Sequence, residues 1–188
     1  MSGPAAMQPN ESHPRPRRVV TGHTSDGVSV VVEDGPVPVS RTIPADGVYF
    51  HEIWNTGTTP ALVRAVEPQE PTLANLTVPP PAGGTKIRIN EFLPGFLDDS
   101  GLQSPVHRTA SVDYGIVLSG EITLVLDDSE VTLRAGDVVV QRGTDHAWAN
   151  RGSVPAMVAF ILVDGELDPE LTASIGGLNG LMRGGPRD

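Results

Sequence analysis

Short, mostly apolar runs rich in β-branched residues alternate with turn residues throughout the stretch from His107 to Asn150. The runs lie at residues 112–118, 122–126, 131–133, 138–140 and 146–148. β-Branched residues favour strands, and the Gly and Asp residues between the runs favour tight turns. Apolar residues hardly ever follow the helical period of 3.6. The stretch therefore predicts an all-β fold, either a barrel or a sandwich.

Further strands are expected on both sides of this stretch. Asp26-Gly27 separates runs at 18–21 and 28–32, which predicts an N-terminal hairpin. Strands at 48–54 and 85–92 enclose a long proline-rich loop, in which we expect one short strand at 61–66. The continuous apolar run 155–163 is typical of a strand buried on both faces. Asp168-Pro169 is an N-cap candidate followed by proline at the first helical position, so a short helix is expected there.

The length of 188 residues is that of one domain. Four prolines among polar residues predict a disordered lead-in at residues 1–17. Residues 18–84 then supply N-terminal strands and a covering loop of the same domain, and residues 85–163 form the barrel. Residues 164–188 are expected to form the short helix and a loose, glycine-rich tail.

Composition excludes several classes of function. The chain has no cysteine, which excludes disulfides, thiolate metal sites and a cysteine nucleophile. Its formal net charge of −10 argues against nucleic acid as a partner, because phosphate binding needs clustered Lys and Arg. No apolar run approaches the roughly 20 residues that cross a bilayer, and no apolar segment follows the N-terminal arginines. We therefore expect a cytoplasmic protein without a secretory signal or a membrane partner.

Side chains at alternate positions of a strand point to the same face, and this alternation groups the candidate site residues. In a continuous strand, His107, Thr109 and Asp113 point the same way. His146 and Trp148 share parity on a later strand. If the two strands are neighbours across a barrel, then His107, Asp113 and His146 converge. Two imidazoles and one carboxylate are the ligands of a facial-triad metal site, which leaves coordination positions open.

The same residues resemble the motifs of the cupin superfamily. Its first motif has the form G-x5-H-x-H-x(3,4)-E-x6-G. His107 stands at the first histidine, Asp113 at the glutamate and Gly120 at the last glycine. Thr109 occupies the position of the second histidine, which is a departure from the motif.

The second cupin motif has the form G-x5-P-x-G-x2-H-x3-N. Its last part, G-x2-H-x3-N, is intact at Gly143, His146 and Asn150. Gln141-Arg142 stands where proline is expected, and the spacing from Gly136 to Gly143 is one residue short. The resemblance covers about residues 85–163.

The resemblance implies a double-stranded β-helix, or jelly-roll barrel, with a pocket at its mouth and often a homodimer. Many relatives hold Fe, Mn, Ni or Zn through three histidines and a glutamate, whereas others use the pocket without a metal. One divalent metal held by His107, Asp113 and His146 is therefore expected here, with a metal-free site as the alternative. Thr109, Arg88 and Trp148 are the candidate substrate contacts.

The expected function is that of a cupin-type enzyme acting on an oxygenated small molecule. With a metal at His107, Asp113 and His146, open coordination positions would polarise a carbonyl or enolate oxygen, or activate dioxygen as in an oxygenase. Without a metal, a histidine and Asp113 would serve as acid and base in an isomerase, dehydratase or decarboxylase. The alternative is a non-catalytic, ligand-binding or sensor barrel. His51 is expected to be a packed, hydrogen-bonded histidine, and no role is assigned to His13 or His23.

Overall fold

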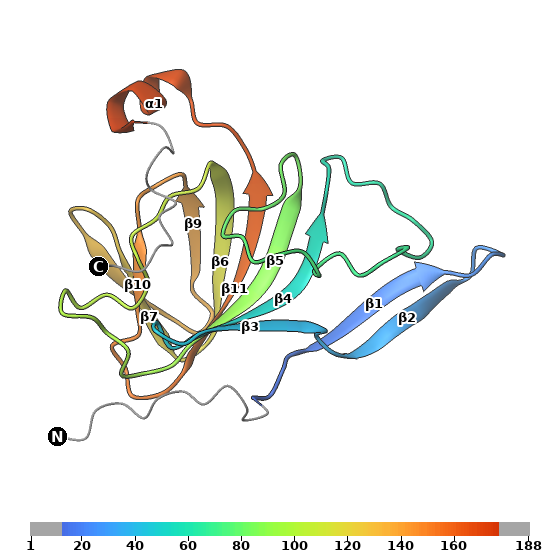
Figure 1. The fold of residues 1–188 in the computed structure, drawn as a ribbon, viewed down its shortest axis with the longest axis horizontal. Coiled ribbons are helices and arrows are strands. Elements are labelled where there is room, and N and C mark those ends of the chain that lie inside the picture. The colour runs from blue at the N-terminus through green and yellow to red at the C-terminus, as the bar shows by residue number, and fades with distance from the viewer. Residues whose placement is uncertain (1–12, 177–188) are drawn as a thin grey trace.

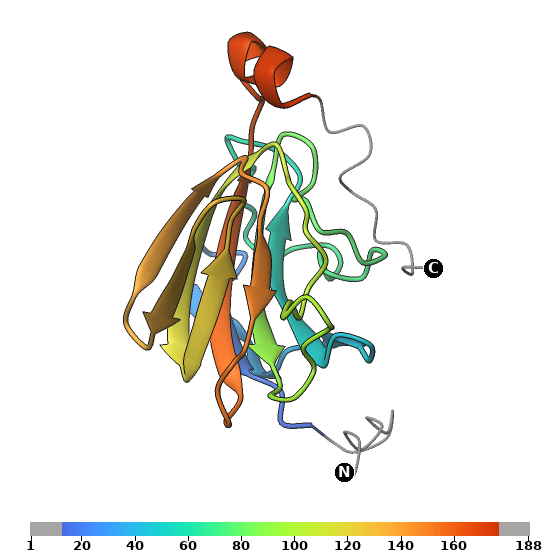
Figure 2. The same cartoon turned by 90° about the vertical axis from the view of Figure 1, so that its left-hand side faces the viewer.

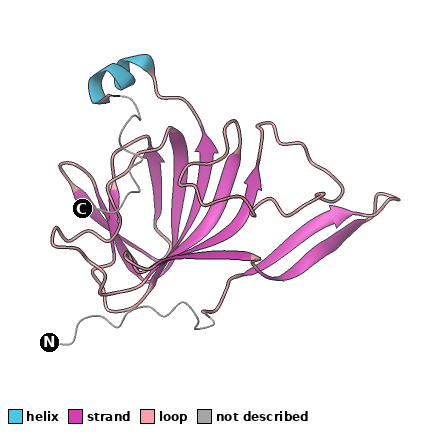
Figure 3. Cartoon of the chain, in the orientation of Figure 1, coloured by secondary structure: helices cyan, strands magenta, loops and turns pink. Residues whose placement is uncertain are grey.

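The computed structural model describes residues 13–176, and most of its regular structure is β-strand (Figures 1 and 3). The expected all-β fold with one short C-terminal helix is thereby confirmed. The elements in chain order are β1 (Arg17–His23), β2 (Ser29–Pro36), β3 (Val39–Ile43), β4 (Val48–Thr56), β5 (Thr85–Phe92), β6 (Ser111–Ser119), β7 (Glu121–Val125), β8 (Glu130–Arg134), β9 (Val138–Arg142), β10 (Ala147–Ala149), β11 (Ala156–Asp164) and α1 (Pro169–Ile175).

Two sheets form the body of the molecule, and every strand pairs antiparallel with its neighbours. The larger sheet has the strand order β3-β4-β5-β11-β6-β9, and the smaller has the order β10-β7-β8. Figure 2 views them from the side. Side chains from both sheets meet in one hydrophobic core. In it, Ile122 of β7 and Trp148 of β10 join Phe92 of β5 and Phe160 of β11. The Trp148 and Phe160 rings meet edge to face, with centroids 5.3 Å apart.

The apolar strand β11 lies in the middle of the larger sheet, between β5 and β6. This central position suits a strand of apolar residues, because neither edge of the strand is open to water. The prediction that it is buried on both faces is only half right, however. Alternate residues from Ala156 to Leu162 are fully buried toward the smaller sheet, whereas Met157, Ala159 and Ile161 are only partly buried on the outer face. The strand follows the usual alternation of one inner and one outer face.

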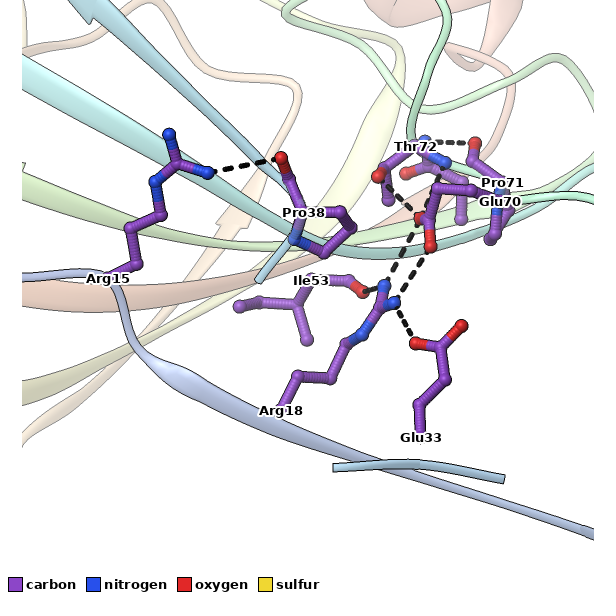
Figure 4. Close-up of polar contacts among 9 residues, drawn as sticks. Arg15, Arg18, Glu33, Pro38, Ile53, Glu70, Pro71 and Thr72 are labelled. Atoms are coloured by element: carbon purple, nitrogen blue, oxygen red, sulfur yellow. Dashed lines mark hydrogen bonds and ion pairs between the residues drawn. The ribbon is translucent and has the colours of Figure 1, made fainter. Parts of the chain in front are cut away.

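The predicted N-terminal hairpin is confirmed as β1 and β2, which form a separate arm beside the larger sheet (Figure 1). Arg18 ties this arm to the body. Its guanidinium donates hydrogen bonds to the Ile53 carbonyl (3.0 Å) and to Glu70 (2.7 Å), and it also pairs with Glu33 (Figure 4). It lies over the Trp54 ring as well, 5.5 Å from the centroid. The β1–β2 arm is therefore held to the body through Ile53, Trp54 and Glu70.

One prediction about the N-terminal half is wrong, and one strand was missed. The expected strand at 61–66 does not form, since those residues have no regular secondary structure. β3 was not predicted as a strand, although it pairs with β4 along five residues. A nearby proline hid this strand, because Pro38 cannot donate to a ladder and lies just outside it. Together with the β4–β5 loop, β3 borders the mouth of the barrel.

At the C-terminal end, the Asp168 side chain accepts hydrogen bonds from the first backbone amides of α1, at Glu170 and Leu171. Pro169 begins the helix, so the predicted cap and first turn are confirmed. Within residues 13–176, no helix has both the length and the hydropathy needed to span a membrane.

Candidate functional site

A cavity of about 500 Å³ lies between the two sheets. Strands β4, β5, β6, β9, β10 and β11 line it, together with the loop at residues 76–79. The structure places all of the predicted site residues on this one cavity, namely Arg88, His107, Thr109, Asp113, His146 and Trp148. Its walls are largely apolar, and the polar groups gather in two places. One is the histidine pair and the other is Arg88 with its neighbours.

His107 and His146 are brought together by a single antiparallel bridge between their backbones. The amide of each residue donates to the carbonyl of the other, with both N···O distances at 3.0 Å. The imidazole rings then lie side by side, with centroids 4.2 Å apart and planes inclined at 55°. Two segments far apart in sequence thus present their rings to the same end of the cavity.

The tautomer of each ring follows from its backbone contact. His107 Nδ1 lies 2.9 Å from the carbonyl oxygen of Pro105, and His146 Nδ1 lies 3.0 Å from that of Thr144. A carbonyl only accepts, so each Nδ1 must carry the proton and donate it. The Nε2 of each ring is left with its lone pair available. This arrangement orients metal-binding and general-base histidines in many proteins.

Burial keeps both imidazoles neutral. Burial and, after it, the neighbouring His107 lower the pKa of His146 to about 4, since two positive charges so close would repel. Burial also lowers the pKa of His107, although the Pro105 carbonyl and Asp113 oppose the shift. Both rings are therefore unprotonated near neutral pH, which is the form that binds metals or accepts protons.

Asp113 is held by two hydroxyl groups. Ser111 Oγ donates to Asp113 Oδ1 at 2.6 Å, and Thr109 Oγ1 lies 3.4 Å from Oδ2. Thr109 thus contacts the carboxylate rather than filling the position of an imidazole. Burial raises the pKa of Asp113, while the hydrogen bonds from Ser111 and Thr109 oppose that shift.

Arg88 forms a buried ion pair with Glu52, with Nη2 and Oε1 3.1 Å apart. The same Nη2 donates to the Thr77 carbonyl at 2.6 Å, and the guanidinium lies over the Phe50 ring, 4.9 Å from its centroid. Burial lowers the pKa of Arg88, and the carboxylate of Glu52 opposes this. The Nε of Arg88 has no hydrogen-bond partner within residues 13–176.

Lys86, the only lysine of the chain, fixes the loop that borders the cavity. Its Nζ donates to the Thr77 carbonyl (2.7 Å), the Thr77 hydroxyl (2.7 Å) and the Pro79 carbonyl (2.8 Å). Burial lowers the pKa of Lys86 to about 8, with nearby Arg88 adding to the shift. Residues 76–79, which we call the roof loop, are thereby held against β5.

Known proteins match the chain over both its barrel and its N-terminal half. The Cupin domain family profile matches residues 97–163. Phomopsin biosynthesis cluster protein C' of Diaporthe leptostromiformis is 35% identical over 174 residues, which cover 88% of this chain and 87% of that protein. The cupin-domain-containing oxidoreductase fogC of Aspergillus ruber is 34% identical over 166 residues, covering 82% and 77% respectively. The chain belongs to the cupin family.

Solved cupin structures match in part. A cupin from Methanocaldococcus jannaschii, described as having a double-stranded β-helix fold, is 20% identical. The match covers 43% of this chain and 70% of that one, with a TM-score of 0.37.

The last residue of the second cupin motif has a structural role. The Asn150 side chain is buried, and its Nδ2 donates to the carbonyls of Phe92 and Val154, both at 2.8 Å. Its Oδ1 accepts from the amide of Gly152 at 2.9 Å. The residue therefore closes the β10–β11 turn and joins it to the end of β5.

The last glycine of the first cupin motif, Gly120, is also required by the local backbone structure. Gly120 has φ of +72°, and a Cβ at this position would lie 2.5 Å from the carbonyl oxygen of Pro155. Both the backbone conformation and the close approach of the neighbouring chain require glycine. The motif thus preserves the barrel's turns as well as its polar pocket.

The cupin family implies a metal, and the residues fit one only in part. The two imidazoles suit it, because they are neutral and held through Nδ1. Asp113 shares their cavity but bonds to hydroxyls. Within residues 13–176, the group of three possible ligands whose atoms all lie within 4.8 Å of one another is a different one: His13, His51 and Glu91. The three barrel residues must therefore draw closer together before they can hold one ion.

Sequence reasoning missed several buried polar residues that line the cavity or lie beside it. Glu52 pairs with Arg88, while Asn90 and Gln141 each have a buried amide atom without a partner within residues 13–176. Parity with Arg88 on β5 could have revealed Asn90, since alternate residues share a face. Nothing in the local sequence indicates that the roof loop returns to Lys86.

Proposed function

We propose that this cupin is an oxidoreductase that acts on a small, oxygenated organic molecule, with His107 and His146 at its reactive centre. The observation that carries the proposal is the paired geometry of these rings. Each Nδ1 is held by a backbone carbonyl, which leaves the lone pair on Nε2, and both rings line the same cavity. Groups positioned in this way need little reorganisation before a reaction.

The shape and polarity of the cavity support a small organic substrate. Apolar side chains such as Phe50, Phe92 and Trp148 supply flat contact surfaces, and about 500 Å³ accommodates a molecule of metabolite size. The uncompensated amide atoms of Asn90 and Gln141 favour a ligand with oxygen or hydroxyl groups. Such a ligand would offset the cost of leaving them unpaired, which is about 1–3 kcal/mol each.

The names of the relatives favour a redox reaction. One is called a cupin-domain-containing oxidoreductase and another a biosynthesis cluster protein. A divalent metal held by His107, His146 and Asp113 would supply redox chemistry and open positions for dioxygen and a substrate oxygen. The chain itself keeps both imidazoles neutral and orients them. It also holds Asp113, whose raised pKa suits it to accept and return a proton.

A non-catalytic ligand-binding barrel is the second candidate. The observation that favours it is Thr109, which bonds to Asp113 where the cupin motif has a third imidazole. Loss of a ligand weakens a metal site, whereas it leaves an apolar cavity intact. The same protein could then bind an oxygenated molecule without transforming it.

Iron binding separates the two candidates. Untagged protein, stripped with a chelator, is titrated anaerobically with Fe(II), and nitric oxide is added as a probe for open coordination positions. The oxidoreductase proposal expects one iron per chain with a nitrosyl EPR signal, and loss of both in His107→Gln and His146→Gln. The exposed His23→Gln variant is the matched control. If iron is not bound, or if these two variants bind it like the control, the proposal is overturned in favour of the ligand-binding barrel.

A further inference from the structure

A second cluster of metal-binding side chains lies on the other face of the larger sheet. Along β4, Val48 and Phe50 line the cavity, so His51 points outward. Along β5, Asn90 and Phe92 line the cavity, so Glu91 points outward as well. The cluster is thus separated from His107 and His146 by the sheet itself.

Strand register explains why His51 and Glu91 meet. His51 lies opposite Ile89 on β5, and Glu91 lies opposite Tyr49 on β4. The two side chains are therefore diagonal neighbours on one face, which is within reach for long side chains. On the other side, Ser40 of β3 lies opposite His51, with its Oγ 2.8 Å from Nδ1. This hydrogen bond fixes the ring and leaves Nε2 directed toward Glu91.

His13 completes the cluster from the segment that precedes β1. Its ring stacks on Tyr49, with centroids 4.0 Å apart, and its Nε2 lies 2.6 Å from Glu91 Oε2. Hydrogen bonds at Arg15 and Pro16 hold this segment against the chain around Pro38. Arg15 donates to the Pro38 carbonyl at 3.3 Å (Figure 4). The Val37 amide donates to the Pro16 carbonyl at 2.9 Å.

One nitrogen in this cluster lacks a partner. His51 is 0% exposed, and its Nε2 has no hydrogen-bond partner within residues 13–176. The nearest acceptor, Glu91 Oε2, lies 3.7 Å away, which is too long for a hydrogen bond. Buried polar atoms are almost always paired, so this nitrogen indicates a missing ligand. Burial would raise the pKa of Glu91, but the imidazoles of His51 and His13 lower it, which keeps the carboxylate charged.

We propose that His13, His51 and Glu91 form a zinc(II) site on the outer face of the sheet. Two imidazoles and a carboxylate are a ligand set that zinc accepts, with a fourth position for water. His13 has 27% of its side chain exposed, which gives the ion and its water an entry. The site is distinct from the barrel centre and does not depend on the proposed reaction.

The ligand atoms of the three residues lie within 4.8 Å of one another, so moderate shifts of the side chains can bring them around one ion. Ligand atoms about 2.0–2.1 Å from a tetrahedral zinc ion are roughly 3.3 Å apart. The His13–Glu91 contact of 2.6 Å must open slightly, and the His51–Glu91 contact of 3.7 Å must close slightly. Both changes are within the freedom of a partly exposed His13 side chain and the carboxylate. A bound ion would fasten the segment before β1 to the barrel.

The test uses the full chain, untagged and chelator-treated, with His107→Gln/His146→Gln in place so that the barrel pair cannot bind. Zinc(II) is titrated by calorimetry, and cobalt(II) is used as a coloured substitute. We expect one equivalent of either metal, with affinity reduced at least tenfold by His13→Gln. His23→Gln, on an exposed histidine of β1, is expected to leave it unchanged. His13 is partly exposed, so its variant should fold.

A second measurement, limited proteolysis, tests whether zinc fastens the segment before β1 to the barrel. Zinc is expected to slow tryptic cleavage after Arg17 in the His23→Gln control but not in His13→Gln. Absence of zinc binding in the barrel-disabled protein would overturn the proposal. Equal affinity in His13→Gln and His23→Gln would also overturn it, because the ion would then lie elsewhere. Neither result bears on iron at His107 and His146.

Discussion

The guanidinium of Arg88 and the carboxylate of Glu52 lie 3.1 Å apart, and their side chains are only 4% and 5% exposed. They come from adjacent strands, where the register places the two residues directly opposite each other. Arg88 lines the cavity, and because both side chains are buried, each charge is compensated inside the protein rather than by water. Arg88 is therefore committed to the barrel wall, and its buried Nε has no hydrogen-bond partner within residues 13–176.

Glu52→Leu is expected to destabilise the protein by about 3–5 kcal/mol, because it leaves a buried arginine without its anion. The double variant Glu52→Leu/Arg88→Met should recover more than half of this loss, since it removes both charges. Urea unfolding of the two variants measures the difference. Equal unfolding free energies would show that Arg88 does not depend on Glu52 for its charge compensation.

Lys86→Met is expected to release the roof loop. It removes three hydrogen bonds from a charged donor to Thr77 and Pro79. Each such bond contributes about 1.5–3 kcal/mol, so amide exchange at Thr77 and Val78 should accelerate at least about tenfold. Hydrogen exchange followed by mass spectrometry tests this, with the core strand β7 as internal reference. Unchanged protection of residues 76–79 would show that other contacts hold the loop.

The metal-free protein is expected to lose stability as the pH falls below about 6.5. Burial lowers the pKa of His146 to about 4, so the unfolded chain takes up a proton before the folded chain does. The stability is fully present above the unfolded pKa and is lost between about pH 6.5 and pH 4. The lowered pKa of His107 adds to this loss of stability on acidification. The raised pKa of Asp113 opposes the loss, because the folded protein takes up that proton more readily than the unfolded chain does.

The contribution of His146 between about pH 7 and pH 5 should be about 2 kcal/mol. Urea unfolding at the two pH values, compared between the wild type and His146→Gln, measures it. The variant should show a smaller loss on acidification. Parallel losses in the two proteins would mean that His146 titrates alike in the folded and unfolded states.

Asn150→Asp is expected to destabilise the barrel more than Asn150→Ala at neutral pH. The Ala variant leaves the carbonyls of Phe92 and Val154 unpaired, at a cost of about 2–4 kcal/mol. The Asp variant adds a carboxylate oxygen against the same two carbonyls, and this oxygen cannot donate. Thermal unfolding ranks the two variants, and the reverse order would contradict the donor role of Nδ2.

The sequence predicted the barrel strands because their signals are local. Alternating burial in β5 and the turn at Gly120 both follow from residues that are near one another in the chain. Parity predicted that Thr109 and Asp113 share one face of a continuous strand. β6 begins only at Ser111, so Thr109 reaches the cavity from the loop before this strand, whereas Asp113 reaches it from the strand itself. Their proposed roles in catalysis or metal binding stay predictions.

Contacts that depend on how strands and loops meet in space could not be predicted in this way. The pairing of Glu52 with Arg88 requires the register of β4 and β5, which no local pattern fixes. His13 contacts Glu91 across a large separation in sequence, through a segment that its prolines marked as irregular. The sequence likewise gave no sign that Thr109 would bond to Asp113.

The roof loop at residues 76–79 lies outside the segment that the Cupin domain profile matches, residues 97–163. Part of the cavity wall is thus encoded separately from the strands that carry His107 and His146. Loops tolerate insertion and exchange better than paired strands do. Residues of this short segment can therefore change the wall of the cavity without disturbing the paired strands and the bridge that hold His107 and His146.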